Sequence, residues 1–95
     1  MKVSELLTDE NKWCQQAFAM DKYGDAVSSR DVDACKWCLS GALMKCYSIE
    51  APVDQTEYML HHRKLMEVVG DLIDWNDAPE RTFAEVREAI LKAGV

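Results

Sequence analysis

The sequence predicts an all-α fold, a small compact bundle of about four helices with a short hairpin after the first helix. Apolar residues recur at helical spacing in several segments, which is the first observation that favours this class. The second is a capping box formed by Thr82 and Glu85, and the third is the clustering of Gly, Pro, Asn and Asp between the apolar segments. Because 95 residues suit one hydrophobic core, we expect a single helical domain over residues 1–95.

The first predicted helix begins near Ser4 or Thr8, since either side chain can cap free backbone N–H groups, and it runs as far as Ala19. Cys14, Ala17 and Phe18 share one face of this helix. Segment 21–25 is a turn by composition, because Gly24 can adopt positive φ and Asp side chains can bond nearby amides. A short hairpin is expected at this turn.

The second predicted helix starts between Ser29 and Asp31 and continues to Tyr47. Apolar residues nearly encircle it, which is the pattern of a central helix covered on more than one side. Gly41 lies inside this helix, where it costs about 1 kcal/mol relative to Ala. We therefore expect a neighbouring helix to approach closely at Gly41.

Pro52 closes the region after the second helix, and Thr56 is a candidate cap for a third, amphipathic helix. Gly70 is expected to end that helix as a left-handed cap, which leaves 71–75 as a separate turn or short extended piece. Segment 76–79 is then a loop. The last helix opens at the capping box of Thr82 and buries three apolar residues before Gly94: Phe83, Val86 and Ile90.

The charge balance bears on the class of partner. The net charge is −6, and residues 51–95 are the more acidic half. A negative field repels phosphate backbones, so we expect no direct nucleic-acid binding and favour a protein partner with a basic surface. The chain shows neither a secretory signal nor a run of 18 apolar residues, so we expect a cytoplasmic protein without a membrane partner. A small core also gains stability by pairing, which makes a homodimer a further option.

Two cysteines and a histidine suggest an alternative chemistry. Cys35 and Cys38 have the spacing of a zinc or redox pair, and His62 lies on the apolar stripe of the third helix. The alternative function is therefore a small enzyme or a zinc-binding protein that uses these three residues. The sequence has no glycine-rich phosphate loop, no Ser-His-Asp order and no second cysteine pair. We accordingly expect no catalytic residue, no metal and no cofactor, and read the cysteines as core thiols.

Three groups of residues carry a resemblance to a known family. Its two most specific parts are Trp37-Cys38-Leu39-x-Gly41-Ala42 and Trp75-Asn76-Asp77 with Arg81-Thr82-x-x-Glu85-Val86. The third group consists of Trp13, Ala17, Ala19, Asp21, Gly24 and Ala34. Together they resemble a family of short, functionally uncharacterised proteins from bacteria and their phages. The resemblance implies a compact helical fold and points to a phage origin, but it brings no activity and no catalytic residues.

The second of these motifs supplies the candidate binding residues, Trp75, Asn76, Asp77 and Arg81. One interpretation is structural: a loop that caps the last helix, with Asp77 paired to Arg81. The other is an exposed patch of aromatic and polar side chains, with the composition of a binding hot spot. The preferred function is a protein-interaction or inhibitory module, directed at a host protein if the chain is phage-encoded.

Overall fold

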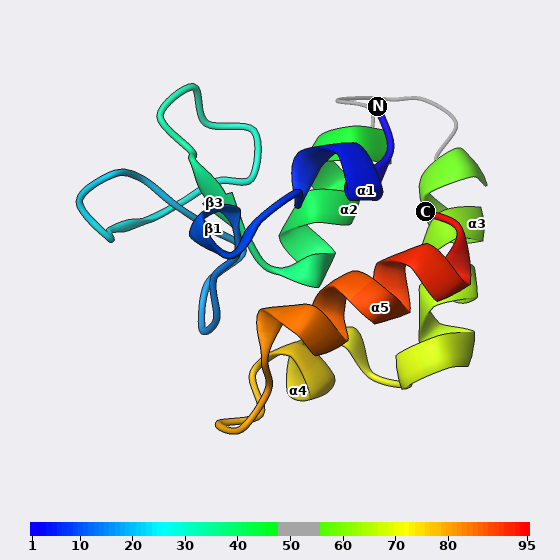
Figure 1. Cartoon of the computed structure of the whole chain (residues 1–95). Coiled ribbons are helices and arrows are strands. Elements are labelled where there is room, and N and C mark those ends of the chain that lie inside the picture. Colours follow the sequence, from blue (N-terminus) through cyan, green and yellow to red (C-terminus); the bar gives the residue numbers. More distant parts are fainter. Residues whose placement is uncertain (48–55) are drawn as a thin grey trace.

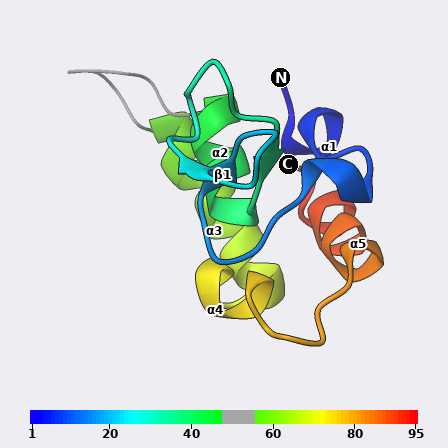
Figure 2. The same cartoon turned by 90° about the vertical axis from the view of Figure 1, so that its left-hand side faces the viewer.

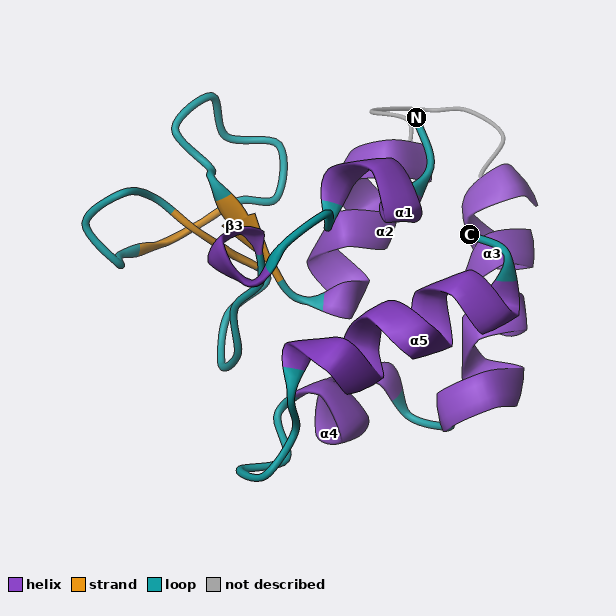
Figure 3. Ribbon diagram, in the orientation of Figure 1, coloured by secondary structure: helices purple, strands orange, loops and turns teal. Residues whose placement is uncertain are grey.

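The computed structural model describes residues 1–47 and 56–95, and it has an α+β fold (Figures 1 and 3). The elements in chain order are α1 (Val3–Leu6), the 3₁₀ helix η1 (Glu10–Lys12), β1 (Ala19–Met20), β2 (Ala26–Val27), β3 (Lys36–Trp37), α2 (Leu39–Tyr47), α3 (Thr56–Val69), α4 (Leu72–Asn76) and α5 (Phe83–Ala93). The predicted all-α class is therefore wrong, because three strands form a small sheet among the helices. Pro52 lies outside the described residues.

The sheet has the order β2-β1-β3 and is antiparallel throughout, with Ala19 opposite both Val27 and Trp37. In place of the first predicted helix, the chain forms α1, η1 and a segment without regular secondary structure that leads into β1. The strand β3 occupies part of the start of the second predicted helix. A helix through residue 16 is impossible here, because Gln16 has a φ of 69°, in the left-handed region. The second helix begins only at Leu39, because the residues before it pair with β1.

Several local predictions are confirmed. Gly24 has a φ of 85°, and the Oδ1 atom of Asp21 accepts hydrogen bonds from the backbone N–H groups of Tyr23 and Asp25. These contacts close the expected hairpin between β1 and β2. Gly70, with a φ of 81°, follows the last residue of α3 as predicted.

The chain after Gly70 forms a short helix, α4, where the sequence suggested a turn or an extended piece. Asp71 caps it by accepting a hydrogen bond from the backbone N–H of Asp74. The capping box of Thr82 and Glu85 opens α5 as expected, and Gly94 ends that helix in the left-handed conformation. Local cap chemistry thus fixes the boundaries of α4 and α5.

The core forms around α2, where Leu39, Ala42 and Leu43 are fully buried. The sheet and its connecting loops stand at one side of the helices and lie in front of α2 in the turned view (Figure 2). A Cβ atom at Gly41 would come within 1.8 Å of the carbonyl oxygen of Phe18. The expected close approach at Gly41 is confirmed, but the neighbour is the segment leading into β1 and not a helix.

Candidate functional site

Asn76 is completely buried and joins three segments of the chain. Its Oδ1 atom accepts hydrogen bonds from the indole Nε1 of Trp13, at 2.7 Å, and from the backbone N–H of Leu39, at 3.2 Å. Its Nδ2 atom donates to the carbonyl oxygen of Cys14 and to Oδ1 of Asp77. The amide therefore uses both acceptor positions and both donors inside the protein, so Asn76 holds the fold together and does not present its side chain at the surface.

Trp75 and Arg81 contact each other. The guanidinium of Arg81 lies 3.9 Å from the centre of the half-buried Trp75 ring, and its Nε donates to the Trp75 carbonyl oxygen. The same guanidinium forms a salt bridge with Glu85 at 3.2 Å. The expected pair of Asp77 with Arg81 is therefore wrong, because Arg81 turns toward α5 and stacks on the indole.

Asp77 instead faces the segment before β1. Its Oδ1 atom accepts hydrogen bonds from the backbone N–H of Gln16, at 3.0 Å, and from Nδ2 of Asn76, at 2.9 Å. Nothing in residues 1–47 or 56–95 bonds to its Oδ2 atom. Gln15 strengthens the same junction, since its Nε2 donates to the carbonyl oxygens of Asn76 and Ala78. The carboxylate is thus fixed in orientation and has one unused oxygen.

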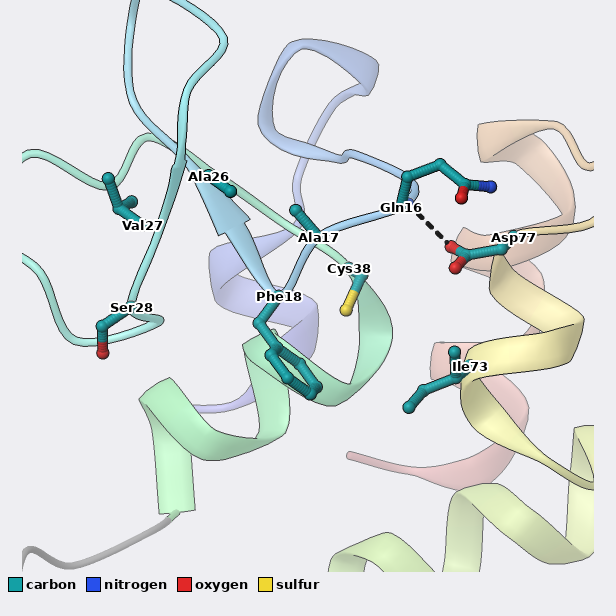
Figure 4. Close-up of a pocket in the computed structure, with 9 residues that line it drawn as sticks. All are labelled: Gln16, Ala17, Phe18, Ala26, Val27, Ser28, Cys38, Ile73 and Asp77. Carbon is teal, nitrogen blue, oxygen red and sulfur yellow. Dashed lines mark hydrogen bonds between the residues drawn. The ribbon is translucent and has the colours of Figure 1, made fainter.

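A cavity of about 460 Å³ lies between the sheet and α4, with Asp77 at one end. Figure 4 shows Phe18 and Ile73 on either side of Cys38, and the hydrogen bond between Gln16 and Asp77 beside them. Phe18 and Ile73 are 46% and 48% exposed, which is high for large apolar side chains. The remaining lining residues are Ala17, Ala26, Val27 and Ser28. This pocket has the apolar walls and few polar groups that are typical of binding sites.

Of the four candidate binding residues, only Asp77 lines this pocket. Sequence reasoning missed Phe18, Val27 and Ile73 as site residues. Phe18 was expected on one face of a helix that does not form, and nothing in the local sequence sets Val27, in the second strand of the hairpin, apart as a site residue. The unusual composition of the Trp75-Asn76-Asp77 stretch was the one available signal, and it indicated one wall of the pocket.

Cys38 lies at the base of the pocket, directly before α2, where its Sγ atom accepts a hydrogen bond from the backbone N–H of Gly41 at 3.3 Å. Burial raises the pKa of the Cys38 thiol, although hydrogen bonds from the backbone of Gly41 and Ser40 oppose the shift. Burial also raises the pKa of Cys14 to about 12. Because the thiolate is the nucleophile, both groups are weak nucleophiles at neutral pH.

The alternative site of Cys35, Cys38 and His62 is not assembled. Cys35 is exposed and Cys38 is buried, and they lie at opposite ends of β3, whereas His62 is on α3 beside the ring of Tyr58. Among the described residues, no three His, Cys, Asp or Glu side chains come together as a metal site. The structure therefore offers no support for the zinc hypothesis.

The described part of the chain contains no helix that is both long and apolar enough to cross a membrane. Comparison of the chain with curated proteins and with solved structures gives no match. Comparison with protein families does, and the matched segment covers residues 1–94, which include the buried Asn76 junction and every residue of the pocket. The chain therefore belongs to DUF6197, a family of unknown function.

Proposed function

We propose that this chain is a protein-interaction module that binds a segment of a partner protein in the pocket between the sheet and α4. The observation that carries the proposal is the juxtaposition of two half-exposed apolar side chains, Phe18 and Ile73, with the fixed carboxylate of Asp77. Central apolar contacts beside a directional polar group are the composition of binding hot spots. The cavity is also large enough to receive a bulky side chain.

The charge of the chain favours a basic partner. The net charge is −6, and residues 71–80, which include α4, contain four acidic residues and no cation: Asp71, Asp74, Asp77 and Glu80. This acidic end borders the pocket through Asp77. Complementary charge speeds encounter and selects against acidic surfaces. In its most specific form, the proposal is an inhibitory module of phage origin that covers a basic surface of a host protein.

The same pocket favours binding over catalysis. Its polar groups are Gln16, Ser28, Cys38 and Asp77, and the raised pKa of Cys38 keeps that thiol protonated. A nucleophile needs a lowered pKa or a base within hydrogen-bond reach, and within residues 1–47 and 56–95 the Cys38 thiol has no side-chain base as a hydrogen-bond partner; it bonds to the Gly41 N–H. Apolar walls with one carboxylate suit recognition of an amphipathic segment better.

The test is selection of peptides from a random library on the intact chain, followed by NMR mapping of the residues whose amide signals shift. We expect the shifts to centre on Phe18, Val27 and Ile73, and we expect Ile73→Ala to weaken binding. Leu91→Ala is the matched control, because Leu91 is a 59% exposed apolar residue on α5 away from the pocket. Peptides that bind both variants equally well would count against the proposal. Light scattering of the free chain shows whether a second copy already occupies the site.

A further inference from the structure

We infer that the segment bound in the pocket carries a lysine or arginine two residues from a bulky apolar residue, and that the cationic group binds Oδ2 of Asp77 while the apolar side chain lies between Phe18 and Ile73. This inference rests on the proposed function and names the chemistry of its partner. It turns a general preference for basic proteins into a requirement for one pair of side chains, two residues apart on the same face of the segment.

Two hydrogen bonds hold the carboxylate of Asp77 in a fixed orientation. Two donors, the Gln16 backbone N–H and Nδ2 of Asn76, converge on Oδ1 at 3.0 and 2.9 Å. Because Asn76 is itself fully buried and fully bonded, the carboxylate cannot rotate without breaking the junction. An arriving donor therefore meets an acceptor that is already oriented, and the entropic cost of binding is lower. Hydrogen bonds between ionised groups are also about twice as strong as neutral ones.

The negative charge of Asp77 is not neutralised by a cation within residues 1–47 and 56–95. The salt bridge within the described residues joins Arg81 to Glu85, and no cation there pairs with Asp77. The negative charge of Asp77 acts inside the pocket: burial is the main cause of the raised pKa of Cys38, and the charge of Asp77 adds to it. A cation from another molecule is the group that would neutralise this carboxylate, and the half-buried position of Asp77 limits screening by solvent.

The carboxylate of Asp77 lies close to the apolar side chains that line the pocket. Ile73 and Asp77 lie one turn apart, and the backbone N–H of Asp77 bonds to the Ile73 carbonyl at 2.9 Å. One helical turn rises about 5.4 Å, so both side chains border the same end of the cavity. Phe18 faces them from the segment before β1 (Figure 4). On one extended segment, side chains two residues apart point to the same face and lie about 6.7 Å apart, so such a pair can reach across this distance.

A defined peptide panel tests the inference. Short synthetic peptides place Leu or Phe two residues from Lys, Arg, Gln or Glu in a Gly/Ser background, and NMR titration of the intact chain measures their affinities. The variant is Asp77→Asn, which keeps Oδ1 as the acceptor for both donors but removes the charge. Asp74→Asn is the matched control: it removes the same charge from the preceding turn of α4, where Asp74 is exposed and bonds to Asp71 through its backbone N–H. Thermal melting shows whether both variants remain folded.

We expect the wild-type chain to prefer Lys and Arg peptides over Gln peptides by about tenfold, a preference that Asp77→Asn abolishes and Asp74→Asn leaves in place. Binding without this preference, but still sensitive to Ile73→Ala, would overturn the inference and leave the proposed function intact. Equal losses in the two Asn variants would also overturn it, because they would indicate general charge attraction. If no peptide shifts the signals of Ile73 and Asp77 at millimolar concentration, both proposals fail.

Discussion

Asn76→Ala removes the amide that joins the segment before β1, the start of α2 and α4. The substitution leaves the indole N–H of Trp13 and the backbone N–H of Leu39 without their acceptor, and the Cys14 carbonyl without its donor. Each unsatisfied buried group costs about 1–3 kcal/mol, and the effects of neighbours are not additive. A total destabilisation of about 3–5 kcal/mol follows, which is a large part of the stability of a small domain.

Urea denaturation monitored by tryptophan fluorescence measures this loss. With a slope of about 1.5 kcal/mol per molar urea, the midpoint should fall by about 2–3 M. The indole N–H signal of Trp13 should also lose its protection against hydrogen exchange, because its only acceptor is removed. Asn11→Ala is the control, since Asn11 is exposed and bonds to Asp9 through its backbone N–H. A destabilisation below about 1 kcal/mol for Asn76→Ala would refute this account of the junction.

Three further predictions follow from other contacts. Gly41→Ala should destabilise the chain by more than about 3 kcal/mol in denaturation experiments, because the new Cβ would meet the Phe18 carbonyl at 1.8 Å. The pKa of Glu85 is lowered from 4.5, first by the hydrogen bond from the Thr82 backbone, so its stabilisation is present at neutral pH and disappears as the pH falls below about 4.5 through the folded-state pKa. The melting temperatures of wild type and Glu85→Gln should therefore converge as the pH falls below 4.5. Cys35 should react first with a thiol reagent in the native state, since it is the exposed cysteine; mass spectrometry of the labelled peptides would reveal any other order.

The correct local predictions depend on short stretches of sequence. The turns and caps formed by Gly24, Gly70 and the Thr82–Glu85 box involve residues within about five positions of one another. They can therefore be predicted without knowledge of the tertiary fold. The sheet could not be found in the same way. Its strands are two residues long, too short to show a period of two, and Ala19 pairs with Trp37 only because the tertiary fold brings them together.

The candidate site shows the same limit. The Asn76-Asp77 pair was correctly singled out as unusual, but its neighbours are Trp13, Gln16 and Leu39, which lie about forty to sixty residues earlier in the chain. An Asn beside an Asp favours a loop when only local chemistry is considered. Its burial became apparent only when the distant donors were placed around it.

The hydrogen bonds of Asn76 also give the protein an internal optical reporter. Asp77 at the edge of the pocket shares Asn76 with the Trp13 indole, so two successive hydrogen bonds connect the pocket to a chromophore. Hydrogen bonds in such chains polarise one another. A cation that binds the Asp77 carboxylate therefore changes the environment of the Trp13 indole. Occupancy of the pocket can then be followed by intrinsic tryptophan fluorescence of the unmodified chain, without a label.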